Sequence, residues 1–232
     1  MNVTICTIGE LLVEFLAKEE NQGFSRPGEF WGPYPSGAPA IFADQVAKLG
    51  FGSVLFSCVG NDAFGEMNIA RLEKDGVNVN GIAMLQKATT GSAFVSYRSQ
   101  AQRDFIFNMP NSACGLFTAE HIDKDLLKQC NHLHIVGSSL FSFRMIDVMR
   151  KAITTIKSAG GTVSFDPNIR KEMLNIPEMS QAFSKSAAKY PRRRREGRVK
   201  AMHSTGSSSE EPSGGRIIPM MAASVSDSSR RS

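Results

Sequence analysis

The sequence contains few cysteines, and none lies in a pattern that binds a metal or forms a disulfide framework. The four cysteines are Cys6, Cys58, Cys114 and Cys130. They are widely spaced and form neither a CxxC motif nor a mixed Cys/His ligand set. This pattern is typical of buried, reduced thiols. It favours neither a zinc module nor a disulfide-stabilised secreted domain.

Long apolar runs are also absent. Crossing a bilayer as a helix takes about 20 consecutive apolar residues, and no run in the sequence approaches that length. The first ten residues, MNVTICTIGE, have no basic segment ahead of a long apolar stretch, which a signal peptide would need. We therefore expect a cytoplasmic protein with no membrane partner.

Residues 1–184 lack the excess of positive charge that a nucleic-acid-binding domain carries. The chain has 27 Lys and Arg against 22 Asp and Glu, but residues 185–232 hold 11 of the basic residues and only 4 of the acidic ones. This leaves 16 basic and 18 acidic residues in residues 1–184. The charge balance therefore disfavours nucleic acid as a partner of this larger part.

Residues 185–232 lack leucine and phenylalanine and contain 11 serines. So little apolar surface cannot offset the entropy lost on ordering, and we predict a disordered Arg/Ser-rich tail. Charge, hydrophobic periodicity and composition all change near residue 184. We therefore interpret residues 1–184 as the folded part. We interpret residues 185–232 as a non-native segment that arises from an out-of-frame or otherwise altered reading of a longer gene.

The sequence does contain an alternation of buried strands and amphipathic helices. The β-branched run at residues 3–9 and the apolar run at residues 53–60 predict strands. Between them, residues 35–50 predict a helix that ends in glycine. A second helix is expected at residues 64–75, with Asp62 as its N-cap. On the first helix, we expect the buried face to carry Ala38, Ile41, Phe42, Val46 and Leu49.

A βαβ unit follows a region of different pattern. Residues 82–109 contain short strand-like pieces that predict a small antiparallel flap. Segments 132–138, 142–161 and 162–168 then predict a strand, a helix and a second buried strand. We expect the helix to turn inward Ile146, Met149, Ile153 and Ile156. The alternation predicts an α/β fold, a doubly wound and mainly parallel sheet whose ligands bind beyond the carboxyl ends of its strands.

Four segments, in this order along the chain, carry a resemblance to a known family. They are SGAPAIFADQVAKLGF, VGNDAFGEMNIARLEKDGVNV, TTGSAFVSY and SFDPNIRKEML. Together they resemble the PfkB (ribokinase-like) carbohydrate kinases, nearest to the 2-keto-3-deoxygluconate kinases and to ketose kinases such as fructokinase and tagatose kinase. The resemblance extends over residues 3–183.

The resemblance implies a ribokinase-like fold in which the antiparallel flap acts as a lid and often forms a homodimer. It implies ATP-dependent phosphoryl transfer to a hydroxyl of a ketose or a keto-deoxy sugar acid. The substrate is then a small-molecule sugar or sugar acid. In the complete family member, ATP and Mg²⁺ take part in the reaction.

Two candidate substrate-binding residues lie early in the chain. Gly37 precedes the first helix, where the absence of a side chain would let a sugar hydroxyl approach backbone N–H groups that have no intrahelical partner. A glycine needed only for a tight turn is the alternative. By resemblance, Glu14 falls where many members place a carboxylate that accepts hydrogen bonds from the sugar. A solvated carboxylate is the other interpretation.

Two further candidates lie in the segment DPNIR, residues 166–170. Asp166 ends the second buried strand and Pro167 stops its ladder, so Asn168 and Arg170 emerge where a ligand is expected. By resemblance, Arg170 matches an arginine that contacts the substrate, and it could bind a sugar-acid carboxylate through two parallel hydrogen bonds. Alternatively, Asp166 and Arg170 simply pair with each other.

Phe105 and Phe107 in the flap correspond by resemblance to aromatic positions on the substrate side. Because side chains alternate along a strand, both should point to the same face, where they could pack over a bound sugar. A core contact or a contact within a dimer would explain them equally well.

The sequence departs from the family pattern in two places. Ile41 stands where many members have an asparagine that contacts the sugar, which leaves the sugar open. The late GAGD-like motif, from which the family draws its catalytic base and anion hole, does not occur. We therefore assign no catalytic, cofactor-binding or metal-binding residue and expect a truncated, incomplete kinase domain. The alternatives are a non-catalytic sugar-binding remnant and nucleic-acid binding through the arginine run at residues 192–198.

Overall fold

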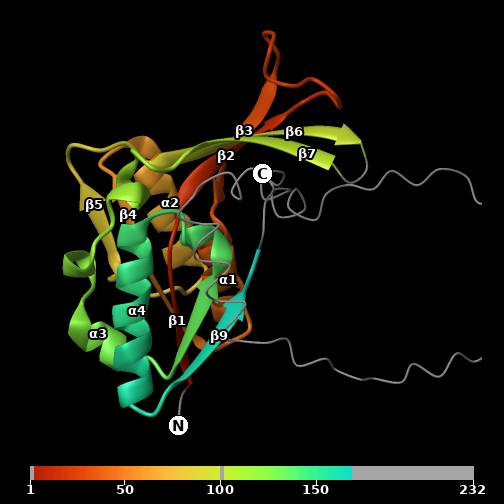
Figure 1. Cartoon of the computed structure of the whole chain (residues 1–232). Coiled ribbons are helices and arrows are strands. Elements are labelled where there is room, and N and C mark those ends of the chain that lie inside the picture. The colour runs from red at the N-terminus through yellow and green to blue at the C-terminus, as the bar shows by residue number, and fades with distance from the viewer. Residues whose placement is uncertain (1–2, 100–101, 169–232) are drawn as a thin grey trace, which may run out of the picture. The chain divides into compact units, whose positions relative to one another are not determined.

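A five-stranded parallel sheet lies at the centre of the computed structural model, which describes residues 3–99 and 102–168 (Figure 1). The strand order is β5-β4-β1-β8-β9, and every neighbouring pair is parallel. The strands are β1 (Thr4–Ile8), β4 (Gly52–Gly60), β5 (Ile82–Leu85), β8 (His132–Val136) and β9 (Thr162–Asp166). The chain moves outward from β1 in both directions, which confirms the predicted doubly wound α/β sheet.

Helices cover both faces of this sheet. They are α1 (Ala38–Lys48), α2 (Ala63–Lys74), α3 (Lys124–Lys128) and α4 (Phe143–Ser158), with 3-10 turns η1 (Ala113–Leu116), η2 (Ala119–His121) and η3 (Gly137–Ser139). From α1, the Phe42 ring stacks on His134 of β8 with 3.8 Å between ring centroids. Leu133 and Ile135 alternate with His134 and pack in one core cluster with Met145 of α4. The helices α1 and α4 therefore lie on opposite faces.

The buried face of α1 differs from the predicted one. Its buried residues are Pro39, Ala40, Ala43 and Val46. Leu49, expected to be buried, is 74% exposed. Ile41 and Phe42 are only partly buried. Small alanines let the helix lie close to the sheet, and the larger apolar side chains are displaced to its flanks.

The helix α4 and the strand β9 show a similar difference in detail. The residues that α4 buries are Met145, Val148, Met149, Ala152 and Ile156. Ile146 and Ile153, predicted to point inward, pack only at the margin of that core. The strand β9 was predicted to be buried, but Asp166 is exposed and the strand is at most half-buried. Within the described residues β9 pairs with β8 alone, so one of its sides has no neighbouring strand.

A second, four-stranded sheet, which we call the lid, lies at the top of Figure 1 beyond the carboxyl ends of the parallel strands. Its order is β3-β2-β6-β7, with β2 (Leu12–Ala17), β3 (Phe30–Ser36), β6 (Gly91–Ser99) and β7 (Gln102–Asn108). Two of these strands lie in the flap predicted for residues 82–109, whereas β5 from that range joins the main sheet. The strands β2 and β3 were not predicted, because β3 contains two prolines and a glycine, which argue against a strand.

The cysteines lie in the core as free thiols. Burial raises the pKa of Cys58 to about 12 and that of Cys114 to about 11. Thiols with such values carry almost no reactive thiolate at neutral pH. No helix in residues 3–99 and 102–168 is long and apolar enough to cross a membrane.

Candidate functional site

The carboxyl ends of β1, β8 and β9 meet at the edge of the parallel sheet that faces the lid. Glu10 follows β1, the turn η3 follows β8, and Asn168 follows β9. The amino end of α1 begins at Gly37 beside them. In an open α/β sheet this edge is where ligands bind. We call the residues Glu10, Ala38, Ser138, Ser139 and Asn168 the sheet-end cluster.

Glu10 is the centre of the sheet-end cluster. It is only 3% exposed. The Ser138 hydroxyl donates to its Oε1 at 2.6 Å, and the Ser139 hydroxyl donates to its Oε2 at 2.7 Å. The backbone N–H of Ala38, in the first turn of α1, also donates to the carboxylate. One buried carboxylate thus connects β1, η3 and the start of α1.

Burial is the main influence on the ionisation of Glu10 and raises the pKa of its carboxyl group. The hydrogen bonds from Ser138, Ser139 and the backbone act in the opposite direction and stabilise the charged form. They only partly compensate, so the pKa stays above its usual value. Carboxyl groups are seldom buried unless they are hydrogen-bonded or functional. The burial of Glu10 therefore marks this end of the sheet as a candidate site.

Gly37 is needed both for its backbone conformation and for its lack of a side chain. Its φ is +114°, which L side chains rarely adopt, and a Cβ atom would lie 2.4 Å from the carbonyl oxygen of Glu10. Both observations support the turn interpretation. Because the neighbouring Ala38 N–H donates to Glu10, the amino end of α1 is partly capped by protein. The approach of a sugar hydroxyl to Gly37 stays a prediction.

Asn168 belongs to the same cluster, as the ligand rule predicted. Its Nδ2 donates to Ser138 Oγ at 3.2 Å, and its backbone N–H donates to Asp166 Oδ1 at 3.1 Å. Its φ of +40° turns the chain sharply after β9. Arg170 lies outside the described residues. Both its predicted contact with the substrate and the alternative, an ion pair with Asp166, therefore stay predictions.

The other three predicted residues lie on one face of the lid. In the strand register Glu14 of β2 is opposite Ala93 of β6, and Ala93 is opposite Phe107 of β7. The rings of Phe105 and Phe107 stack with 5.1 Å between their centroids. Residues directly opposite one another share a face of the sheet. We call Glu14, Phe105 and Phe107 the lid face.

A hollow lies against the other face of the lid sheet, near the start of α2. It has a volume of about 510 Å³ and is lined by Phe15, Asp62, Ala63, Phe64, Thr89, Thr90, Ser92, Phe94 and Asn108. Phe15 and Asn108 are the chain neighbours of Glu14 and Phe107 and therefore point the other way. The lining residue Asp62 caps α2 as predicted, accepting from the N–H of Gly65 at 2.9 Å. This hollow contains none of the predicted site residues.

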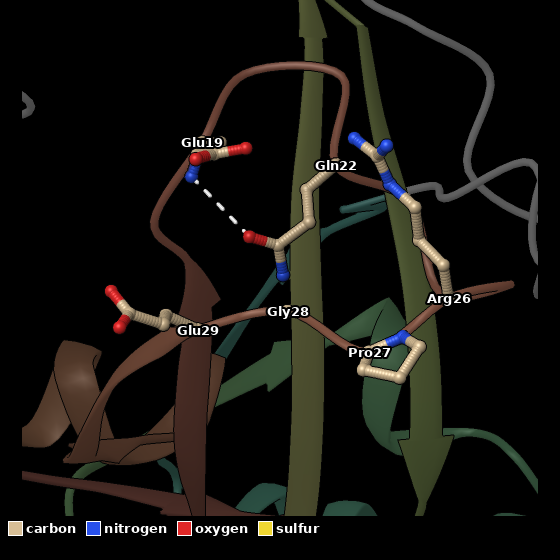
Figure 2. Close-up of a pocket in the computed structure, with 6 residues that line it drawn as sticks. All are labelled: Glu19, Gln22, Arg26, Pro27, Gly28 and Glu29. Carbon is tan, nitrogen blue, oxygen red and sulfur yellow. Dashed lines mark hydrogen bonds between the residues drawn. The ribbon is translucent and has the colours of Figure 1, made fainter.

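A second hollow, of about 280 Å³, lies in the loop between β2 and β3 (Figure 2). Its lining residues are Glu19, Gln22, Arg26, Pro27, Gly28 and Glu29. Within it, the backbone N–H of Glu19 donates to Gln22 Oε1 at 3.5 Å (Figure 2). Glu29 pairs with Lys18 at 2.5 Å. The residues that line this hollow all come from that one loop, and none of them lies at the end of a strand of the parallel sheet.

The described residues were also compared with what a metal site requires. Within 3–99 and 102–168, no group of three or more His, Cys, Asp or Glu side chains could hold a metal ion. The polar side chains of the sheet-end cluster are one carboxylate, two hydroxyls and one amide. The carboxylate and both hydroxyls already bond to one another, and the amide is a group that can hold a hydroxyl-bearing ligand by a hydrogen bond.

Glu10, Ser138 and Ser139 were not predicted from the sequence. Glu14 in the segment GELLVEF was preferred for its family position, although Glu10 lies nearer to the end of β1. A signal was present, since Glu10 directly follows the strand predicted at residues 3–9 and Ser138 ends the strand predicted at residues 132–138. In the structure each lies two residues beyond the end of its strand. Polar residues at that point of a parallel strand are candidates for the ligand site.

Comparisons with known proteins agree with this geometry. Residues 3–188 match the sequence profile of a family described as pfkB family carbohydrate kinase. The chain is 34% identical over 166 residues to "Probable fructokinase-5" from Arabidopsis thaliana, covering 72% of this chain and 51% of that protein. It is 33% identical over 166 residues to "Fructokinase-2" from Oryza sativa subsp. japonica, covering 72% and 49%. The chain spans about half the length of the curated relatives it matches.

Solved structures show the same similarity. A candidate Ribokinase II from E. coli, in complex with ATP and Mg²⁺, is 56% identical, with a TM-score of 0.72 over 79% of this chain and 59% of that one. A fructokinase from Xylella fastidiosa with bound ATP is 29% identical, with a TM-score of 0.65 over 75% of this chain and 54% of that one. The parallel sheet and the lid sheet thus follow a known ribokinase-like arrangement.

Proposed function

The chain belongs to the pfkB family of carbohydrate kinases, and we propose that it is the sugar-binding part of a kinase that, in its complete form, transfers a phosphoryl group from ATP to a hydroxyl of a ketose or a keto-deoxy sugar acid, and that this chain lacks the catalytic base and the nucleotide site. The names of its relatives support a sugar as the acceptor. The E. coli relative in complex with ATP and Mg²⁺ supports this nucleotide and metal as the donor system. Within that proposal, residues 1–184 are the part of the kinase domain that holds the sugar, and residues 185–232 take no part in it.

One observation carries the proposal for the sugar site. The ends of β1, β8 and β9 converge on a polar cluster with a buried carboxylate, and the lid extends from this same edge. The sheet-end cluster and the lid sheet can together enclose a small hydroxylated ligand between them. No such convergence occurs at the loop hollow around Arg26.

The individual roles follow from the chemistry of each side chain. We propose that Glu14 accepts hydrogen bonds from sugar hydroxyls, while Phe105 and Phe107 pack against the apolar face of the sugar. Gly37 leaves room for the ligand beside α1. Arg170 would bind the carboxylate of a sugar acid bidentately, since its planar fork matches that group.

Phosphoryl transfer also needs a base near the acceptor hydroxyl, donors for the developing charge and a metal-bound nucleotide. The described residues contain no cluster suited to a metal. We therefore assign no Mg²⁺ ligand to residues 3–99 and 102–168, and we propose sugar binding as the role of these residues.

A homodimer through the lid and a cytoplasmic location complete the proposal. Three apolar side chains of the lid strands are exposed, Trp31 at 52%, Ile106 at 44% and Tyr34 at 39%. Exposed apolar side chains on a sheet with two free edges favour pairing with a second copy. Sedimentation velocity of the chain tests this part, with a dimer as the expected result and a monomer at all concentrations as the contrary one.

The function is tested by measuring binding and turnover on the same preparation. Titration calorimetry with fructose and with 2-keto-3-deoxygluconate reports binding, and ADP release with ATP and Mg²⁺ reports turnover. Saturable binding without ADP release is the expected result for this chain. Sugar-dependent ADP release would contradict the absence of a catalytic base and a nucleotide site. Absence of both contradicts the proposed site and its function.

A further inference from the structure

A chain of hydrogen bonds connects the buried Glu10 carboxylate with Asn168. Asn168 Nδ2 donates to Ser138 Oγ at 3.2 Å, and Ser138 Oγ donates to Glu10 Oε1 at 2.6 Å. The three residues come from the ends of three different strands. This chain of contacts runs from the buried Glu10 to the half-buried Asn168, which follows β9.

The direction of this chain is set by the bond from Ser138 to Glu10. A serine hydroxyl has a single hydrogen to donate. Because Ser138 uses that hydrogen on Glu10, its oxygen can only accept from Asn168. The amide of Asn168 must therefore turn its Nδ2 toward Ser138. The two ends of an asparagine amide are nearly alike in shape, so such a network is what distinguishes them.

The consequence concerns the oxygen of the Asn168 side-chain amide. With Nδ2 directed to Ser138, Oδ1 of Asn168 faces away from it. Within the described part of the chain, no group donates a hydrogen bond to this oxygen. The backbone of Asn168 is held by its N–H bond to Asp166 Oδ1, so the amide is presented from a fixed point.

We propose that Glu10 is a positioning residue which orients the Asn168 amide through Ser138, so that Asn168 Oδ1 accepts a hydrogen bond from a hydroxyl of the bound sugar. This inference rests on the proposed sugar site. It also defines the chemistry of the ligand at this point. A carboxylate or phosphate oxygen facing Oδ1 would meet a second acceptor and be repelled. The group beside Asn168 is therefore a hydroxyl, and the carboxylate of a sugar acid lies elsewhere.

The chain offers a matched control in the adjacent serine. Ser138 and Ser139 are both buried, at 2% and 0% exposure, and each donates to one oxygen of Glu10. Only Ser138 contacts Asn168. The substitutions Ser138→Ala and Ser139→Ala therefore remove the same hydroxyl and the same kind of bond to Glu10. They differ in whether Asn168 loses its partner.

Fructose binding by the full chain measures the consequence. We expect Ser138→Ala to raise the dissociation constant about tenfold, the effect of one misdirected hydrogen bond. Ser139→Ala should change it by less than about threefold. Thermal unfolding should show similar destabilisation in both variants. Equal losses of affinity in the two variants, or a larger loss in Ser139→Ala, would overturn the inference.

A measurement without sugar separates this inference from the proposed function. In an NMR pH titration, the Asn168 side-chain amide should shift with the same midpoint as the Glu10 carboxyl carbon, in the wild type and in Ser139→Ala. In Ser138→Ala that response should disappear. The exposed Asn61 amide, which donates to Gln86, should not respond in any variant.

The combined outcomes are decisive. If Asn168 does not respond to Glu10 in the wild type, the positioning role is wrong even if fructose binds. If Asn168 responds but neither fructose nor 2-keto-3-deoxygluconate binds, the proposed sugar site is wrong and the assignment of a sugar hydroxyl to Asn168 fails with it. If both results are positive and the serine variants differ as expected, the inference stands.

Discussion

Two carboxylates only four residues apart, Glu10 and Glu14, belong to different regions and have opposite environments. Glu10 is buried in the sheet-end cluster and accepts hydrogen bonds from two serines. Glu14 lies half-buried on a lid strand, opposite Ala93 and Tyr34. The sheet end is tied together by side chains from distant parts of the chain, whereas the lid is held by strand pairing.

The difference suggests that the two carboxylates have different roles, one in stability and one in ligand binding. A buried carboxylate with all its bonds made inside the protein stabilises geometry and has no capacity left for a ligand. A carboxylate on a lid strand can change its partners when a ligand arrives. Substitution of Glu10 should therefore change stability more than substitution of Glu14 does, whereas substitutions that remove or misdirect a proposed sugar contact, at Asn168 or on the lid face, should mainly change affinity.

The largest effect is expected at the glycine that supports the cluster. Gly37→Ala places a Cβ atom 2.4 Å from the Glu10 carbonyl oxygen at a φ of +114°, and should lower the free energy of unfolding by about 3 kcal/mol. Gly50→Ala is the control, since Gly50 has a φ of +84° but nothing within 4 Å. It should cost about 1 kcal/mol. Urea unfolding of both variants separates the clash from the backbone strain, and equal costs would contradict the account.

The two carboxylates themselves provide the next comparison. Glu10→Ala leaves two serine hydroxyls and the Ala38 N–H without an acceptor, and should lower the free energy of unfolding by about 2 kcal/mol. Glu14→Ala should lower it by less than about 1 kcal/mol. Chemical denaturation gives both numbers. The assignment of different roles to Glu10 and Glu14 is wrong if Glu14→Ala destabilises the protein as much as Glu10→Ala does.

The pH dependence of stability gives a smaller effect at Glu10. Burial raises the pKa of Glu10 in the folded protein above its usual value of 4.5, so the folded state binds the proton more tightly than the unfolded state. The contribution of Glu10 to stability should therefore increase as the pH falls through the raised pKa toward 4.5. Glu10→Gln should remove this increase, which unfolding curves between pH 4 and pH 7 will measure. An unchanged pH profile in the variant would count against a raised pKa.

Two histidines on β8 should give an opposite and weaker trend. Burial lowers the pKa of His132 and of His134 below the usual 6.5. Their neutral forms share hydrogen bonds with Thr162 and Ser164 of β9. Stability from these groups is complete above pH 6.5 and should decline as the pH falls through their lowered pKa values. In the double variant His132→Gln/His134→Gln, the free energy of unfolding should fall less steeply as the pH is lowered. If it falls as steeply as in the wild type, other groups cause the decline.

Much of the fold could be predicted from the sequence because its signals are local. Alternating buried strands and amphipathic helices fixed the positions of β1, α1, β4, α2, β8, α4 and β9 along the chain. The buried face of α1 could not be predicted by hydrophobicity alone. Close packing against the sheet favours the small Ala40 and Ala43, and it leaves Leu49 in solvent.

The candidate site was only partly predictable for a similar reason. Gly37 and Asn168 could be predicted because chain position and strand ends mark them, and their contacts with a sugar stay predictions. Glu10 was missed, since its importance depends on Ser138 and Ser139, more than 120 residues away. The shared side of Phe105 and Phe107 follows from strand alternation, but their alignment with Glu14 required the register of β2, β6 and β7.

The most direct test is an NMR titration of the isotope-labelled full chain with fructose. The account predicts saturable shifts of the Ala38 and Asn168 amides in the sheet-end cluster and of Phe107 on the lid face. Gln22 and Arg26, which line the hollow between β2 and β3, should not move. Shifts confined to that loop, or no shifts at saturating sugar, would contradict the assignment of the sugar site to the sheet end and the lid.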